Sequence, residues 1–156
     1  MLLWMTIAFC WMTVGLACSC GRQGDRAYCR YDVVFRGRPV AEHMVETGPF
    51  DFNGVRTYTV EVDEIFRSKN RSVGLTTVNV TTPNNDGMCG VVFTLNTAYV
   101  IVANNGFNGL ETYLCDGSRG WNSLSDQRKT FLSTTMRDVC NRASKVTPAS
   151  PGFSRL

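Results

Sequence analysis

The residues with the most distinctive chemistry are the two cysteines of Cys18-Ser19-Cys20, which directly follow an apolar segment. Cleavage of the chain after Ala17 would give Cys18 a free α-amino group, whose pKa is about 8. This amine and the carbonyl oxygen of the same residue can chelate one metal ion as a five-membered ring. If both cysteines form disulfides, the tripeptide is held at each end and loses little conformational entropy on binding. The pattern therefore allows two interpretations: a rigid chain terminus that binds a metal, or two disulfides that staple the chain and have no further role.

An enzyme with a metal or nucleophile of its own finds little support. A catalytic zinc site usually draws two or three His ligands, whereas the sequence has one histidine, His43, which we place in a polar stretch between two strands. No Gly-x-Ser-x-Gly elbow is present. We interpret Asp51 and Asp63-Glu64 as solvated surface, because adjacent strand residues point to opposite faces. We expect no enzymatic activity and no cofactor.

A catalytic zinc in a protease matches such a terminus better. That zinc keeps an open position, which water normally fills. An amine and a carbonyl that displace this water also remove the nucleophile that the protease needs. Under the metal-binding interpretation, the zinc would be the ion of a bound protease, and the metal-binding atoms would be the backbone N and O of Cys18.

Residues 1–17 read as a signal peptide. They carry no charged side chain and are too short for a membrane helix, which needs about 20 apolar residues. Gly15 and Ala17 are small residues at the two positions that a signal peptidase reads. We expect a secreted protein of the extracellular space or matrix, with no membrane span after cleavage. The segment lacks the usual Lys or Arg, so a retained membrane anchor stays as the alternative.

The cysteine count indicates an oxidising compartment. The seven cysteines are Cys10, Cys18, Cys20, Cys29, Cys89, Cys115 and Cys140. Loss of Cys10 with the signal peptide leaves an even number, which implies a disulfide framework. Six cysteines allow fifteen pairings, and their order alone does not choose among them. Pairing each early cysteine with a late one would staple the N-terminal segment across the domain, at about 3–5 kcal/mol each in the chain-entropy model.

Length and composition fit one globular domain. The chain has 156 residues and a hydrophobic fraction of 44%, which counts against disorder. A net charge of +3 from scattered arginines is too small to indicate nucleic acid as a partner. At most it permits a weak attraction to matrix polysaccharide. We expect a monomer.

Apolar patterning predicts a mainly β domain. Period-two alternation or short apolar runs predict strands at 31–40, 57–66, 75–82, 91–95, 98–103 and 110–114. Gly48-Pro49 and Asn53-Gly54 mark a turn between the first two. Sequons at Asn70 and Asn79 are candidate N-glycosylation sites, and Asn79 falls on the polar face of its strand.

A helix is predicted beyond Trp121. Apolar residues from Leu124 to Val139 recur at helical spacing, and Cys140 would tie the helix end to the body. Asn122 or Ser123 would cap this helix, Ser123 as part of a capping box with Asp126. Residues 141–156 are expected to form a disordered tail. Together these elements predict a closed antiparallel barrel of five to six strands with short flanking helices.

Several motifs together resemble one family. The resemblance rests on these residues: Cys18-Ser19-Cys20, Cys29, Met88-Cys89-Gly90-Val91, Cys115, Trp121-Asn122-Ser123-Leu124-Ser125, Gln127-Arg128 and Cys140. Residues 18–140 resemble the N-terminal inhibitory domain of the tissue inhibitors of metalloproteinases. That resemblance implies a netrin-like, OB-fold-like barrel with three disulfides that inhibits zinc metalloproteinases, chiefly matrix metalloproteinases and related metzincins.

The resemblance also assigns roles to residues. It implies the disulfides Cys18–Cys89, Cys20–Cys115 and Cys29–Cys140. The first residue would chelate the zinc of the protease, and Ser19 would point into its primed specificity pocket. The implied protease-binding residues are Cys18, Ser19, Cys20 and Gly21, with Asp86, Gly87, Met88 and Cys89 as a second ridge.

The sequence departs from the family after Cys140. Full-length vertebrate members continue into a second cysteine-rich domain, whereas sixteen residues without cysteine follow here. We expect a single-domain member, similar to invertebrate forms, without the functions of the second domain.

Two other functions stay open. A netrin-like module that binds matrix or a receptor, and inhibits nothing, shares the barrel and the cysteines. Such modules usually end a larger protein, where the first cysteine has no free amine. An oligonucleotide-binding protein shares the barrel type, but secretion and weak basicity count against it.

Overall fold

The computed structural model describes residues 18–21, 23–45, 54–69, 76–107 and 109–146. Six features of the sequence lie outside these ranges: the signal peptide at 1–17, the Gly48-Pro49 turn, Asp51, Asn53 of the Asn53-Gly54 pair, the Asn70 sequon and residues 147–156 of the expected tail. Among the described residues, no helix has the length and apolar content needed to cross a membrane.

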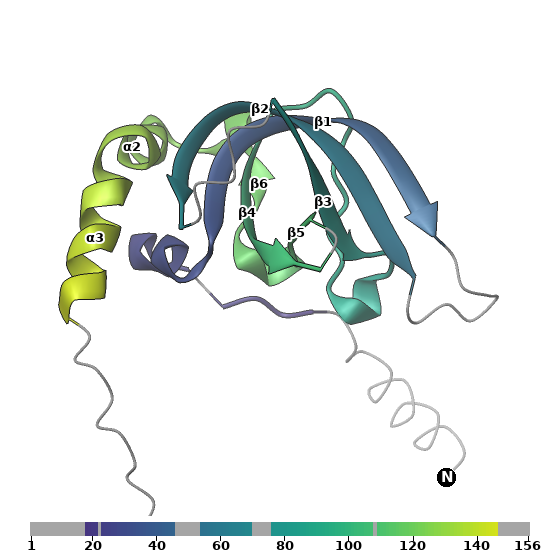
Figure 1. Ribbon diagram of the computed structural model, residues 1–156, viewed down its shortest axis with the longest axis horizontal. Helices are drawn as coiled ribbons and strands as arrows, with labels where there is room; N and C mark the ends of the chain where they lie inside the picture. The colour runs from purple at the N-terminus through teal and green to yellow at the C-terminus, as the bar shows by residue number, and fades with distance from the viewer. Residues whose placement is uncertain (1–17, 22, 46–53, 70–75, 108, 147–156) are drawn as a thin grey trace, which may run out of the picture.

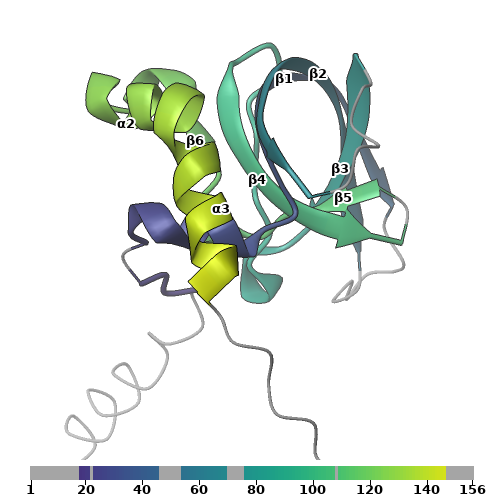
Figure 2. The ribbon, with the colours of Figure 1, turned by 60° about the vertical axis from the view of Figure 1, so that its left-hand side comes forward.

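Five strands form a closed ring, and a short sixth strand is attached to it (Figures 1 and 2). The order around the ring is β1 (Val33–Val45), β2 (Val55–Ser68), β3 (Thr77–Pro83), β5 (Gly109–Glu111) and β4 (Tyr99–Gly106). Pairing of β1 with β4, from Val33 opposite Ala103 to Gly37 opposite Tyr99, closes the ring. β6 (Arg119–Gly120) pairs with β4. The predicted mainly β barrel of five to six strands is confirmed.

One pairing of the ring is parallel, although the predicted barrel was antiparallel. β3 and β5 run in the same direction, with Val80 opposite Leu110 and Thr81 opposite Glu111. The other four pairings are antiparallel. A closed ring with an odd number of strands cannot reverse direction at every step, so one parallel contact is unavoidable.

Strands β1 and β4 separate two apolar clusters, which explains their uninterrupted apolar runs. The cluster inside the barrel comprises Val33, Phe35, Tyr58, Val60, Val80, Val91, Phe93, Ile101, Ala103 and Leu110. The cluster between barrel and helices comprises Tyr28, Val34, Phe66, Val100, Val102, Leu132, Met136 and Cys140. Full burial of one such side chain contributes about 1.5–3 kcal/mol. Strands β2 and β3 instead alternate over much of their length, as their sequence predicts.

A helical layer covers the outer face of the barrel (Figure 2). It consists of α2 (Asp126–Thr130), the π-helical turn η5 (Phe131–Thr135) and α3 (Met136–Val146). The 3-10 helix η1 (Asp25–Arg30) packs against α3, to which the Cys29–Cys140 disulfide joins it. Helix α3 continues six residues past Cys140, so residues 141–146 are helical where a disordered tail was expected.

The predicted helix cap is wrong by two to three residues. Asn122 and Ser123 belong to a separate 3-10 turn, η4 (Trp121–Ser123), and the Ser123 hydroxyl donates to the Gly120 carbonyl. Ser125 is the N-cap of α2, and its hydroxyl accepts the Arg128 amide at 3.3 Å. Asn122, Ser123 and Ser125 are all residues that favour the N-cap position, so local sequence could not choose between them.

The strand predicted at 91–95 is absent, although its apolar residues are buried. Phe93 enters the barrel and makes edge-to-face contacts with Tyr58 and Tyr99, at centroid distances of 5.1 and 4.9 Å. Its amide donates to the Tyr58 hydroxyl at 3.1 Å, and the Val91 amide donates to the Thr82 hydroxyl at 2.9 Å. Side chains thus replace a strand ladder, because this segment plugs the barrel instead of extending its wall.

Two smaller expectations also need correction. His43 lies within β1, opposite Thr57, and not between strands. The last predicted strand, at 110–114, is shorter: β5 ends at Glu111, and a 3-10 helix, η3 (Leu114–Asp116), follows.

Candidate functional site

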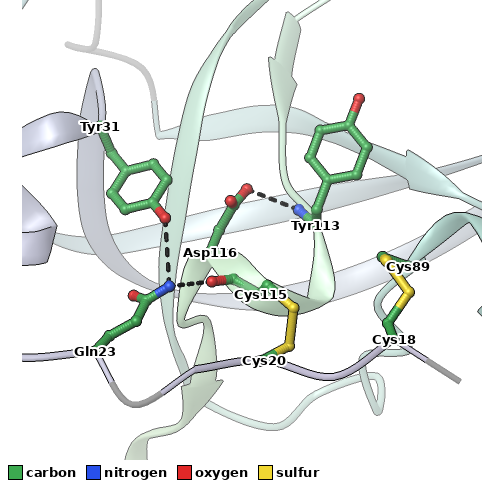
Figure 3. Close-up of a disulfide and its surroundings, with 8 residues drawn as sticks. All are labelled: Cys18, Cys20, Gln23, Tyr31, Cys89, Tyr113, Cys115 and Asp116. Atoms are coloured by element: carbon green, nitrogen blue, oxygen red, sulfur yellow. Dashed lines mark hydrogen bonds between the residues drawn. A yellow bond between two sulfur atoms is a disulfide. The ribbon is translucent and has the colours of Figure 1, made fainter.

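Two disulfides fix the N-terminal segment to two neighbouring loops (Figure 3). Cys18 is bonded to Cys89 with their Cα atoms 5.6 Å apart, and Cys20 to Cys115 with 5.1 Å. These are the pairings that the family resemblance implies. Ser19 lies between the two bonds and is exposed. The segment therefore presents one exposed residue between two covalent attachments.

The loop that carries Cys89 lies between β3 and β4 and has an internal hydrogen-bond framework. The Asn85 side-chain oxygen accepts the Met88 amide at 2.9 Å, and the Asn85 carbonyl accepts the Gly90 amide at 3.1 Å. These bonds close the 3-10 turn η2 (Asp86–Met88). The Met88 side chain is 49% exposed. The loop thus presents an apolar side chain from a constrained turn.

The backbone at Cys89 and Gly90 has an unusual conformation. Cys89 has a φ of 58°, which non-glycine residues rarely adopt. A Cβ atom at Gly90 would collide with the Pro83 carbonyl oxygen. The loop therefore presses against the end of β3 here, and a side chain at Gly90 would displace Cys89 and the disulfide that it forms.

The second loop is bonded to the first. The Leu114 amide donates to the Cys89 carbonyl at 2.8 Å. Inside η3, the Tyr113 amide donates to the Asp116 carboxylate and the Asp116 amide to the Tyr113 carbonyl, each at 2.9 Å. The partners of Cys18 and Cys20 are therefore joined to each other, so the two clamps form one unit.

The structure brings the predicted residues of both segments to one end of the barrel. Ser19, Cys20, Gly21, Gly87 and Met88 are exposed, whereas Cys18 and Cys89 are partly buried. The backbone of Asp86 lies in η2, and its side chain is outside the described part of the structure.

Two further exposed residues lie beside this surface and were not predicted. Tyr113 and Leu114 are 41% and 47% exposed and directly precede Cys115. Their apolar character led us to place them in a strand. The signal that could have located them is the pairing of Cys115 with Cys20, which brings residues next to Cys115 close to the terminus.

A polar cluster lies beneath the segment (Figure 3). The Gln23 side-chain amide donates to the Cys115 carbonyl and, at 3.5 Å, to the Tyr31 hydroxyl. Burial raises the pKa of the Asp116 carboxyl, against hydrogen bonds from the Tyr113 amide and the Tyr31 hydroxyl that lower it. Burial also raises the pKa of Tyr31, and the nearby Asp116 carboxylate adds to this shift.

Other predicted features lie away from this end. Asn79 is exposed on β3, as expected for the polar face of its strand, and its side-chain oxygen accepts the Thr59 hydroxyl at 3.4 Å. Glycosylation of Asn79 stays a prediction. Within the described residues, no group of three or more His, Cys, Asp or Glu side chains could hold a metal ion.

Fold and site together define a disulfide-stapled β-barrel whose N-terminal segment is clamped to two loops. A family model, tissue inhibitor of metalloproteinase, matches residues 16–152. This chain belongs to the tissue inhibitor of metalloproteinase family. The match covers the whole described barrel and its helical layer.

Two relatives carry the name metalloproteinase inhibitor 3. The one from Scyliorhinus torazame is 26% identical over 132 residues, which are 82% of this chain and 58% of the relative. The one from Xenopus laevis is 27% identical over 117 residues, which are 74% of this chain and 52% of the relative. The chain therefore spans about half the length of the curated relatives it matches.

Proposed function

We propose that this chain, beginning at Cys18 after removal of residues 1–17, inhibits zinc metalloendopeptidases of the matrix metalloproteinase type. The names of its relatives support this class of target. The observation that carries the proposal is the double clamp: Cys18 and Cys20 are bonded to loops that the Leu114–Cys89 hydrogen bond joins. A terminus held in this way binds with little loss of conformational entropy.

The proposed mechanism uses the backbone of one residue. The α-amine and carbonyl of Cys18 occupy the open position on the zinc of the target and displace its water, which removes the nucleophile of the protease. The amine must be deprotonated to bind the metal. Ser19, exposed between the clamps, enters the primed pocket, and the exposed Met88 contacts the enzyme beside it.

Location and partners follow from the same proposal. Three disulfides support an oxidising compartment, so we propose secretion to the extracellular space or matrix. The inhibitor acts as a monomer, needs no cofactor, and takes matrix polysaccharide as at most a weak second partner.

The test uses the secreted protein and one variant. Edman or mass-spectrometric sequencing should give Cys18 as the first residue, and the protein should inhibit a panel of matrix metalloproteinases. A form with one additional Ala before Cys18 should lose inhibition with an unchanged melting temperature, since its amine no longer lies at the zinc. Comparable inhibition by the extended form would refute chelation by Cys18. A native protein that begins at Cys18 and inhibits nothing would instead favour the matrix-binding module.

A further inference from the structure

The N-terminal segment meets Cys115 twice, through two different kinds of bond. Cys20 is bonded to its sulfur, and the Gln23 side chain donates a hydrogen bond to its carbonyl (Figure 3). A disulfide joins side chains and leaves rotation about several single bonds, so it limits the position of the Cys20 backbone more than its direction. A second attachment three residues further along fixes that direction as well.

Both hydrogens of the Gln23 side-chain amide take part in hydrogen bonds. Its amide nitrogen carries two hydrogens, which serve the Cys115 carbonyl and the Tyr31 hydroxyl. The Tyr31 hydroxyl in turn lies near the carboxylate of Asp116, which accepts the Tyr113 amide and so closes η3 next to Cys115. The hydrogen bonds therefore run from the terminal segment into the loop that receives its second disulfide.

The space around Gln23 is shaped for it. Gly117 directly follows Asp116. Its φ of 97° is a backbone conformation that residues with an L side chain rarely adopt. A Cβ atom there would lie 2.8 Å from the Gln23 side-chain oxygen. Absence of a side chain at Gly117 thus leaves room for the Gln23 amide group.

We propose that Gln23 is a positioning residue, which locks the direction of the Cys18–Gly21 segment and so presents the amine and carbonyl of Cys18 in one orientation. This inference rests on the proposed inhibition through Cys18. An inhibitor whose competent conformation is only partly populated binds more weakly in proportion to that fraction. Loss of Gln23 should therefore weaken inhibition without unfolding the barrel.

The experiment compares matched substitutions at the two glutamines of the chain. Gln23→Met keeps length but cannot donate, and Gln23→Glu keeps shape but places an acceptor against the Cys115 carbonyl. Gln127→Met and Gln127→Glu are the controls, because Gln127 is exposed on α2, in the helical layer (Figure 1). Readouts are the inhibition constant for one matrix metalloproteinase, the melting temperature and ¹⁵N order parameters of the Ser19, Cys20 and Gly21 amides.

Both Gln23 variants lose both hydrogen bonds and should inhibit about five- to tenfold more weakly, since the 3.5 Å bond to Tyr31 adds little to the bond to Cys115. Their order parameters should fall from about 0.85 toward 0.6, while the melting temperature and both Gln127 controls stay at the parent value. Unchanged order parameters in the Gln23 variants would overturn the positioning role. If the parent protein inhibits no protease, the proposed function fails, yet the order parameters still decide whether Gln23 holds the segment.

Discussion

The two sides of the barrel are held by different forces, although each carries a disulfide that spans most of the domain. On the helical side, Cys140 is joined to Cys29 in a cluster where Leu132 and Met136 are buried. At the terminus, Cys20 and its neighbours are exposed, and disulfides and hydrogen bonds hold the segment in place of apolar packing. Under the proposed function this surface must stay exposed to bind a protease, so burial cannot stabilise it and disulfides hold it instead.

The largest expected difference between the two sides is in the effect that removal of one disulfide has on inhibition. Cys20→Ala with Cys115→Ala and Cys29→Ala with Cys140→Ala open loops of similar size, with sequence separations of 95 and 111. Each pair should cost about 2–5 kcal/mol of stability. Only the first should weaken inhibition, by about 100-fold, because two or so backbone residues become free. Denaturant melts and inhibition constants measure both; equal loss of inhibition in the two variants would contradict the division.

Truncation on the helical side should affect stability alone. Met136 is fully buried between α3 and the barrel. Met136→Ala should lower the free energy of unfolding by about 2–5 kcal/mol, with an unchanged inhibition constant where the variant is folded. Chemical denaturation and an inhibition assay at 10 °C give the two values. A parallel loss of inhibition would mean that the helical layer also shapes the terminus.

Substitution at the terminus should have the opposite pattern. Ser19 is exposed between two disulfides, so Ser19→Leu should leave the melting temperature unchanged. Proteases with deep primed pockets should still be inhibited, whereas shallow pockets should lose about 1–3 kcal/mol of binding through overfilling. Inhibition constants across a panel test this, with Ser19→Gly as a control that removes the side chain. Identical selectivity of the parent and both variants would place the contact surface elsewhere.

Acid should weaken inhibition before it weakens the fold. In the proposed mechanism the α-amine of Cys18 binds zinc only when deprotonated, so inhibition should fall up to about tenfold per pH unit below a pKa of about 8. The inhibition constant from pH 6 to 8.5, corrected for titration of the protease alone, measures this, and the melting temperature is the control. A flat profile would count against amine coordination.

The smallest effect is expected at the start of β1. Lys69 and Asn105 hydrogen bonds lower the pKa of the Asp32 carboxyl. A lowered pKa in the folded state stabilises the protein above the pKa of the unfolded chain, about 3.9, and this stabilisation is lost as pH falls through the folded value. An exposed pair contributes about 0.5 kcal/mol. Asp32→Asn should therefore flatten the unfolding free energy slightly between pH 5 and 3, and an unchanged slope would exclude Asp32 as a source.

The strands that were predicted best from the sequence are those with one face toward solvent and the other toward the core. Thr59 and Val60 in β2 alternate between solvent and core, and this period is visible in the residues. The segment around Phe93 was wrongly predicted as a strand, because a segment that fills the barrel interior is as apolar as a buried strand. Tyr113 and Leu114 were missed at the site because their exposure depends on a loop geometry that no local pattern encodes. Spacing also left the cysteine pairing undetermined, and family resemblance supplied it.

The wide separation of the bonded cysteines in the chain limits when each disulfide can form during synthesis. Cys18 leaves the ribosome 71 residues before its partner, Cys89, and Cys29 leaves 111 residues before Cys140. At about 5–20 residues per second, Cys18 waits about 4–14 s. During that time, once residues 1–17 are removed as proposed, Cys18, Cys20 and Cys29 are one another's nearest thiols, and any bond among them is non-native. The native bonds can therefore form only late, when most of the barrel has been made, and any earlier bond among these three cysteines must be undone by thiol–disulfide exchange.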